Sequence, residues 1–266
     1  MSRLAIMAGA GQLPVSIASA FPDAFVVAFS GMETSVQPDV TFRFEHLGGL
    51  FETLREESVE RVVMAGAMSR PPLDPSAFDD GMAAIAPILL EAMSGGDDGL
   101  LRQVISIFED QDFRVIGAHS LLPELTAEEG IVVGDPISSA TEQDIVRADS
   151  ILGSLSPVDV GQAVVVEGGV CLGVETIQGT DALLDFVAQT PQHLRRGAGV
   201  LVKRPKVAQD LRVDMPTIGP DTIAKVKEAG LSGVIVSPGT VLLVERDALI
   251  AKARQEGVFV LARRHG

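Results

Sequence analysis

Short apolar runs alternate with stretches of helical periodicity along the first half of the chain. Runs that are apolar throughout are typical of parallel strands buried on both faces. Helices between such strands indicate right-handed crossovers, and so we expect a Rossmann-like parallel sheet over residues 1–135. The predicted strands are Leu4–Ala8, Ala24–Phe29, Arg61–Ala65 and Phe113–Gly117, and the predicted helices are Leu13–Ala20, Leu47–Glu56, Met82–Met93 and Gly99–Asp110.

The second half begins with two β-rich runs on either side of Gly168-Gly169, a pattern that predicts a hairpin. Helical and apolar segments then alternate again, which predicts a second α/β domain with a mixed sheet, the catalytic domain, over residues 159–266. Its predicted strands are Gln162–Glu167, Val170–Glu175, Gly199–Lys203 and runs near Val234, Val241 and Val258, and its predicted helices are Asp181–Gln189, Asp221–Ala229 and Asp247–Gln255.

Between the halves, residues 120–140 are rich in Pro, Gly, Glu and Ser and lack clear periodicity, which is typical of a connecting segment. Thr141 with Asp144 three positions later predicts a capped helix that continues to Leu155. Its polar face indicates a surface helix at the domain junction, and we take residues 136–158 as the linker.

Composition narrows the class of protein. The chain is 46% hydrophobic and 21% charged, which is typical of a globular protein with a core. A net charge of −15 and the lack of Trp and Tyr argue against nucleic-acid binding. The single cysteine, Cys171, excludes an internal disulfide, and its apolar run predicts a buried thiol. No run reaches the roughly 18 apolar residues of a membrane span, so we expect a cytoplasmic protein.

Two glycines and two polar residues follow predicted strands of the first half. Gly9 and Gly11 precede a helix, where backbone N–H groups can face a phosphate, or where a tight turn needs small residues. Ser69 and Arg70 lie where ligands bind in open α/β sheets, and either bind an anion or belong to a solvated loop. His119 is more often a structural residue in such a position.

Positive charge is concentrated in the second half of this acidic chain. Six of its 21 basic residues lie between Arg195 and Arg212, which favours an anion-binding role. Asp210, Arg212 and Asp214 are spaced two apart, so an extended backbone between Pro205 and Pro216 would point all three to one face. Two carboxylates around a guanidinium can hold Mg²⁺ against phosphate oxygens. The alternative is a surface strand with a ladder of salt bridges.

The loop before the helix at residue 181 offers further polar groups. Thr180 is a candidate N-cap, and Asp181 or Glu175 is a candidate metal or sugar ligand. Capping without any ligand explains these residues equally well.

Several segments together resemble the LpxI-type UDP-2,3-diacylglucosamine pyrophosphatases of lipid A biosynthesis. The family often has a second glycine where Ala10 stands. The matching segments are Ala8–Pro14, Ala65-Gly66 with Ser69–Pro71, Gly96–Asp98 with Leu100–Arg102, Gly117–His119, Asp159–Gln162, Val174-Glu175 with Gly179–Asp181, Lys206 with Gln209-Asp210, Arg212–Asp214 and Pro216–Gly219.

The resemblance implies hydrolysis of the lipid-linked UDP-sugar to UMP and 2,3-diacylglucosamine 1-phosphate (lipid X), with Mg²⁺ or Mn²⁺. It further implies a site between two domains, a homodimer, and peripheral contact with the inner membrane. In the family the acid matching Asp214 is needed for catalysis. We expect catalytic roles for Asp214, Asp210, Arg212 and Lys203, metal binding by Asp214 and Asp210, and substrate binding by Gly9, Gly11, Ser69, Arg70, Gln162, Thr180, Asp181, Lys206, Gln209 and Thr217.

Two other functions remain open at this point. A non-catalytic sensor of nucleotide sugars would use the same residues without metal chemistry. A nicotinamide-dependent oxidoreductase would depend on Gly9 and Gly11 alone, without the third glycine of a dinucleotide fingerprint.

Overall fold

The computed structural model describes residues 3–68, 72–93, 97–207 and 209–265. The chain forms two compact units. Unit 1 is Met1–Leu122 with Asp210–Asp214, and unit 2 is Pro123–Gln209 with Met215–Gly266. The structure thus divides the chain near residue 122 instead of 135, and a short segment far along the chain belongs to the first unit.

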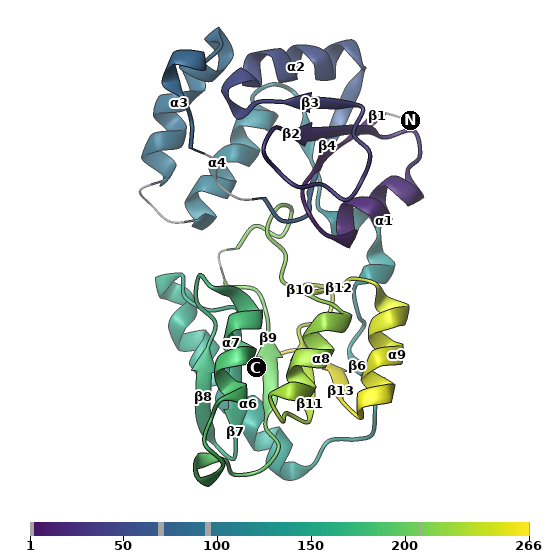
Figure 1. Cartoon of the computed structure of the whole chain (residues 1–266), viewed down its shortest axis with the longest axis vertical. Coiled ribbons are helices and arrows are strands. Elements are labelled where there is room, and N and C mark those ends of the chain that lie inside the picture. The colour runs from purple at the N-terminus through teal and green to yellow at the C-terminus, as the bar shows by residue number, and fades with distance from the viewer. Residues whose placement is uncertain (1–2, 69–71, 94–96, 208, 266) are drawn as a thin grey trace. The chain divides into compact units, whose positions relative to one another are not determined.

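Unit 1 is built on a five-stranded sheet in the order β3-β2-β1-β4-β5, in which every pair of neighbours is parallel (Figure 1). The central strands β1 and β2 are almost wholly buried, which is typical of a parallel sheet covered on both faces, whereas β3 and β5 carry an exposed residue. The strands are β1 (Arg3–Ala8), β2 (Phe25–Phe29), β3 (Val40–Phe42), β4 (Val59–Ala65) and β5 (Arg114–Val115), and the helices are α1 (Gln12–Ala20), α2 (Leu47–Glu56), α3 (Asp80–Met93), α4 (Asp97–Glu109) and α5 (Ala118–Leu121).

Aromatic side chains fill much of the core of unit 1. Phe51 of α2 packs against Phe108 of α4 with ring centroids 5.2 Å apart, and against Phe113 at 6.1 Å. Burial of rings of this size contributes strongly to the stability of a core. The Rossmann-like prediction for this region is confirmed, although β3 was missed because it has only three residues, of which Thr41 is exposed.

Unit 2 is built on a six-stranded mixed sheet in the order β6-β13-β11-β9-β7-β8. Strands β9, β11 and β13 are parallel, whereas β6, β7 and β8 each pair antiparallel with a neighbour. The strands are β6 (Gly130–Val133), β7 (Ala163–Glu167), β8 (Val170–Val174), β9 (Val200–Lys203), β11 (Gly233–Val236) and β13 (Phe259–Ala262), with a separate pair β10 (Thr217–Ile218) and β12 (Leu242–Leu243).

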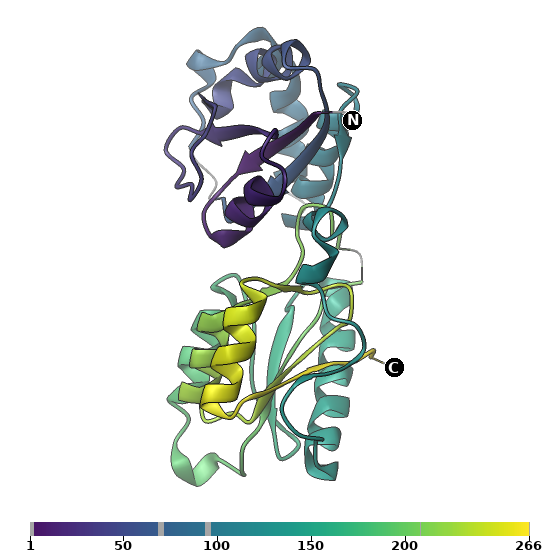
Figure 2. The same ribbon diagram turned by 90° about the vertical axis from the view of Figure 1, so that its right-hand side faces the viewer.

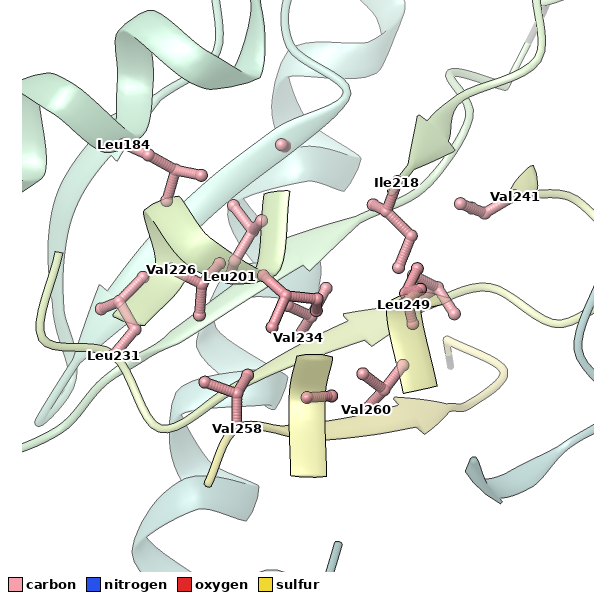
Figure 3. Close-up of a cluster of buried hydrophobic side chains, with 14 of the residues drawn as sticks. Leu184, Leu201, Ile218, Val226, Leu231, Val234, Val241, Leu249, Val258 and Val260 are labelled. Carbon is pink, nitrogen blue, oxygen red and sulfur yellow. The ribbon is translucent and has the colours of Figure 1, made fainter. Parts of the chain in front are cut away.

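Helices cover both faces of this sheet (Figure 2). Helices α7 (Gly179–Ala188), α8 (Pro220–Glu228) and α9 (Arg246–Glu256) pack on one face, where Leu184, Val226 and Leu249 meet strand residues such as Val234 (Figure 3). Helix α6 (Ser139–Leu155) packs on the other face through Ile145, Ala148 and Leu152. The mixed α/β prediction for the second half is therefore confirmed.

Helix α6 differs from its prediction. Ser138, not Thr141, caps the helix, because its side chain accepts the Thr141 N–H. Asp144 instead accepts the N–H groups of Gly168 and Gly169 at 3.0 and 2.6 Å and so holds the β7–β8 turn. The helix is consequently part of the core of unit 2 and not a linker on the surface.

The β7–β8 hairpin and Cys171 test two further predictions. The hairpin at Gly168-Gly169 is confirmed, with both glycines at positive φ. Cys171 is exposed on edge strand β8, so the prediction of a buried thiol is wrong. Among the described residues, none of the helices has the length and apolar character needed to traverse a bilayer.

Candidate functional site

The loops after β1 and β4 touch through their backbones at the point where the strand order of unit 1 reverses. The Gly9 N–H donates to Ala65 O at 2.8 Å, and Ala10 and Ala67 exchange two hydrogen bonds. A Cβ on Gly9 would lie 2.4 Å from Ala67 O, and one on Gly66 would lie 2.5 Å from Ala10 O. These glycines are therefore required for the close approach of the two loops.

The donor groups predicted for a phosphate at this place are engaged within the protein. Besides the bond from Gly9, the Gly11 N–H donates to Ser35 Oγ at 3.2 Å, and Gly11 has a φ of 95°. The alternative interpretation, a turn that needs small residues, accounts for both glycines. The role of Gly9 and Gly11 in holding the diphosphate stays a prediction. Ser69 and Arg70 lie outside the described residues.

Asp210, Arg212 and Asp214 form a tight turn and not an extended ribbon. The N–H groups of Val213 and Asp214 donate back to Asp210 O at 3.3 and 3.2 Å. The Asp210 side chain also accepts the Arg212 N–H at 3.0 Å, and this local bond stabilises a turn over a strand. The prediction of three side chains on one face of a strand is therefore wrong in its geometry, although Asp210 and Arg212 do meet.

The Arg212 guanidinium is held in a fork by Asp210. Its Nε lies 3.0 and 3.2 Å from the two carboxylate oxygens, and its Nη2 lies 2.7 Å from Oδ2. Glu109, at the end of α4, accepts from Nη1 at 2.7 Å. The hydrogen bonds from Arg212 hold the pKa of Asp210 below its usual value, and Asp210 in turn raises the pKa of Arg212. We call this group the Arg212 turn.

His119 lies near the same turn in unit 1. A Cβ on Gly117 would lie 2.7 Å from His119 Nδ1 and 3.2 Å from the Arg212 Cα, so the imidazole and the turn both border Gly117. Burial lowers the pKa of His119, and its Nδ1 has no hydrogen-bond partner among the described residues. A neutral imidazole is therefore the form favoured here at neutral pH.

A second polar group lies at the carboxyl end of β9 in unit 2. The Lys203 ammonium donates to Thr180 Oγ1, and the Thr180 hydroxyl donates to Glu175 Oε1 at 3.1 Å. Lys203 Nζ lies 3.8 Å from that carboxylate oxygen, and the side chains of Lys203 and Glu175 are only 8% and 12% exposed. Glu175 Oε2 is buried without a hydrogen-bond partner among the described residues. We call these three residues the Lys203 cluster.

The Lys203 cluster combines a buried ammonium group with the N-terminal end of helix α7. Thr180 lies in the first turn of α7, where backbone N–H groups and the helix dipole favour an anion. The ammonium of a buried lysine is a strong local positive charge in this otherwise acidic chain. The structure thus joins Lys203 and Thr180, which were predicted separately, and adds Glu175 as their acidic partner.

The remaining predicted residues of unit 2 contact other residues of the same unit. The Lys206 side chain pairs with Asp159, and the backbone N–H of Lys206 donates to Gln209 Oε1 at 3.0 Å. Gln162 O accepts the Arg204 N–H at 2.8 Å. The Thr217 hydroxyl donates to Met215 O, while Asp181 is exposed in the first turn of α7.

The six basic residues are divided between the two units, and several of them form ion pairs. Arg195 pairs with buried Glu167 at 2.6 Å, and Arg204 pairs with Asp149 at 3.5 Å. Arg212 belongs to unit 1. Charge density along the sequence therefore overestimated the local positive charge, because five of these six cations pair with acids that are distant in sequence.

Asp210 does not fit the role of metal ligand, because Arg212 donates hydrogen bonds to both of its oxygens. Among the residues that the structure describes, no three acidic, histidine or cysteine side chains group around a potential ion position. Mg²⁺ is often held by one carboxylate together with phosphate oxygens and waters. Asp214 belongs to the same turn, and its role as a metal ligand stays a prediction.

Comparison with protein-family models covers nearly the whole chain. Residues 3–125 match the LpxI N-terminal domain, and residues 128–261 match the LpxI C-terminal domain. The chain belongs to the LpxI family. A curated relative from Caulobacter vibrioides is 38% identical over 98% of this chain and 97% of its own length. That relative is named UDP-2,3-diacylglucosamine pyrophosphatase LpxI.

The LpxI domain models meet close to the boundary between the two units. The first ends at residue 125 and the second begins at 128, while the structural boundary lies after Leu122. Two partners of the candidate residues were not predicted, Glu109 for Arg212 and Asp159 for Lys206. No local signal identifies them, because they lie 103 and 47 positions away along the chain.

Proposed function

We propose that this chain is an enzyme that hydrolyses the diphosphate of UDP-2,3-diacylglucosamine to UMP and 2,3-diacylglucosamine 1-phosphate. The relative's activity and its 38% identity over 98% of the chain support the substrate. The observation that carries the chemistry is the Lys203 cluster, a buried ammonium at the first turn of a helix. Such a site favours the binding of the negatively charged diphosphate group that links a nucleoside to a sugar.

In this proposal the protein's own groups bind and orient the diphosphate. Lys203 and the Thr180 hydroxyl donate hydrogen bonds to phosphate oxygens, and Lys206 adds positive charge. Arg212, kept in one orientation by Asp210, offers a further planar donor. Asp214 is required for the attack of water on the sugar-side phosphorus, from which UMP departs.

We also propose that Mg²⁺ assists, held by Asp214 together with the substrate's phosphate oxygens. When bound, the ion neutralises charge on the diphosphate. The other expected ligand, Asp210, has no place in this arrangement because Arg212 binds it. The homodimer and the contact with the inner membrane stay predictions from the family resemblance.

The test is incubation of the full chain with UDP-2,3-diacylglucosamine, with Mg²⁺ or with EDTA, followed by product analysis. We expect equal amounts of UMP and the diacylated sugar phosphate in the presence of Mg²⁺, and loss of product with EDTA. Binding of the substrate without any product over hours would instead support a nucleotide-sugar sensor. Turnover that is undiminished by EDTA would overturn the metal proposal alone.

A further inference from the structure

The Arg212 turn is a short segment of unit 1 that lies, along the chain, within unit 2. Gln209 and Met215 belong to unit 2, whereas Asp210–Asp214 between them belong to unit 1. The segment before the turn is held within unit 2, since buried Gln209 accepts the backbone N–H of Lys206 at 3.0 Å. The five residues of the turn therefore need contacts of their own to stay on unit 1.

The turn contacts unit 1 through one apolar side chain and one ion pair. Val213 is partly buried against the hydrophobic core of unit 1, in the cluster that contains Phe108 and Phe113. Arg212 pairs with Glu109 at 2.7 Å, but these two side chains are 38% and 43% exposed. An exposed ion pair contributes little, whereas an apolar side chain that is removed from water contributes more. Val213 is therefore the stronger of the two contacts.

Gly117, two positions after β5, allows the turn to lie close to unit 1. A Cβ on this glycine would lie 3.2 Å from the Arg212 Cα and 2.4 Å from His119 Cε1. The backbone of the turn thus packs against a residue without a side chain, with the imidazole also beside it. Such close packing leaves little room for the turn to shift while Val213 stays in contact with the core.

The position of Asp214 depends on this packing. Asp214 directly follows Val213, and its N–H donates to Asp210 O at 3.2 Å within the turn. We propose that Val213 is a positioning residue, which keeps the Asp214 carboxylate where the reaction needs it. The proposal rests on the proposed function, in which Asp214 is required for the attack of water. Displacement of a catalytic group by about 1 Å can lower a rate by about 10²-fold.

The test replaces Val213 by a polar residue of similar size. Asn is favoured in turns, so Val213→Asn should keep the turn but place an amide against the apolar core. We expect kcat to fall by about tenfold or more, because Asp214 is no longer held in place. We also expect the backbone amides of residues 210–214 to exchange with deuterium about tenfold faster.

Two control variants separate positioning from general stability. Val213→Ile keeps the apolar contact and should retain a kcat near that of the wild type. Val40→Asn is the matched control, because Val40 of β3 is partly buried against the same core at the opposite edge of the sheet. It should change neither kcat nor the exchange of the turn. A loss of kcat in Val40→Asn equal to that in Val213→Asn would overturn the proposal.

A double variant tests whether Val213 acts through Asp214. When Asp214→Asn is already present, Val213→Asn should lower kcat no further. A further tenfold loss in the double variant, or a wild-type kcat in Val213→Asn despite faster exchange, would refute the positioning role. If the wild type releases no UMP, the proposed function fails. Hydrogen exchange then tests the contact alone: faster exchange in Val213→Asn than in the wild type supports it, and equal exchange refutes it.

Discussion

Arg212 and Lys203 are two cations only nine positions apart, yet they have opposite environments. Arg212 is 38% exposed, and its fork is made with an acid two positions away. Lys203 is 8% exposed, and its partners Glu175 and Thr180 lie more than 20 positions away along the chain. An exposed ion pair contributes little to stability, whereas a buried one is costly to break. The spacing of residues along the sequence therefore overstated the importance of the Arg212 turn as a candidate site and understated that of the buried Lys203.

The largest effect is expected at Asp214, the second acid of the Arg212 turn. Asp214→Asn should lower kcat by about 10³-fold, because the proposed reaction needs its carboxylate. The variant should fold normally, as judged by its thermal unfolding. Turnover near that of the wild type would refute the catalytic assignment of Asp214.

The next largest effect is expected at the buried cation. Lys203→Met should lower kcat/KM by about 10²-fold through loss of a phosphate contact. It should also destabilise the fold by about 2 kcal/mol, because the Glu175 charge stays buried without its ammonium partner.

A double variant separates these two roles of Lys203. Lys203→Met with Glu175→Gln should recover much of the free energy of unfolding but none of the turnover. Recovery of both would mean that the cluster is purely structural.

A smaller effect is expected for the other acid of the turn. Asp210→Asn should lower kcat/KM by about tenfold, because Arg212 keeps Glu109 but loses its fork. Stability should change by less than about 1 kcal/mol, as for other exposed pairs. Glu109→Gln, which leaves the fork intact, is the matched control and should have less effect on kcat/KM than Asp210→Asn. The reverse order would assign the positioning of Arg212 to Glu109.

The smallest effect is a pH dependence of stability. The pKa of Asp210 is lowered by its bonds with Arg212, so the pair stabilises the fold fully above the unfolded pKa of about 4. This contribution is lost as the pH falls through the lower folded pKa. Denaturation at pH 5 and pH 3 should therefore show a larger loss for the wild type than for Asp210→Asn. Equal losses would mean that the fork stores no stability.

Most helices and the buried strands were predictable because their apolar residues follow clear periodicities. Strand β6 was missed because it is an edge strand whose first two residues are exposed. The N-cap of α6 was misplaced because Ser138 and Thr141 are both favourable N-cap residues. The predicted cap at Thr141 also needed Asp144 as its partner, but Asp144 binds the β7–β8 turn instead.

The candidate site was predictable only in part. The residue types at Lys203, Thr180 and Glu175 were recognised, but a pattern along the chain cannot show that β9, the β8–α7 loop and α7 bring them together. At Asp210, spacing suggested a strand, and the local side-chain bond to the Arg212 N–H made a turn. That competition between side chain and backbone has no signature in apolar periodicity.

Hydrolysis in water labelled with heavy oxygen tests the central claim most directly. We predict that the full chain, with Mg²⁺ and UDP-2,3-diacylglucosamine, incorporates one labelled oxygen into the diacylated sugar phosphate and none into UMP. Label in UMP would contradict attack at the sugar-side phosphorus. Unchanged substrate after prolonged incubation would contradict the assignment of this chain as a pyrophosphatase.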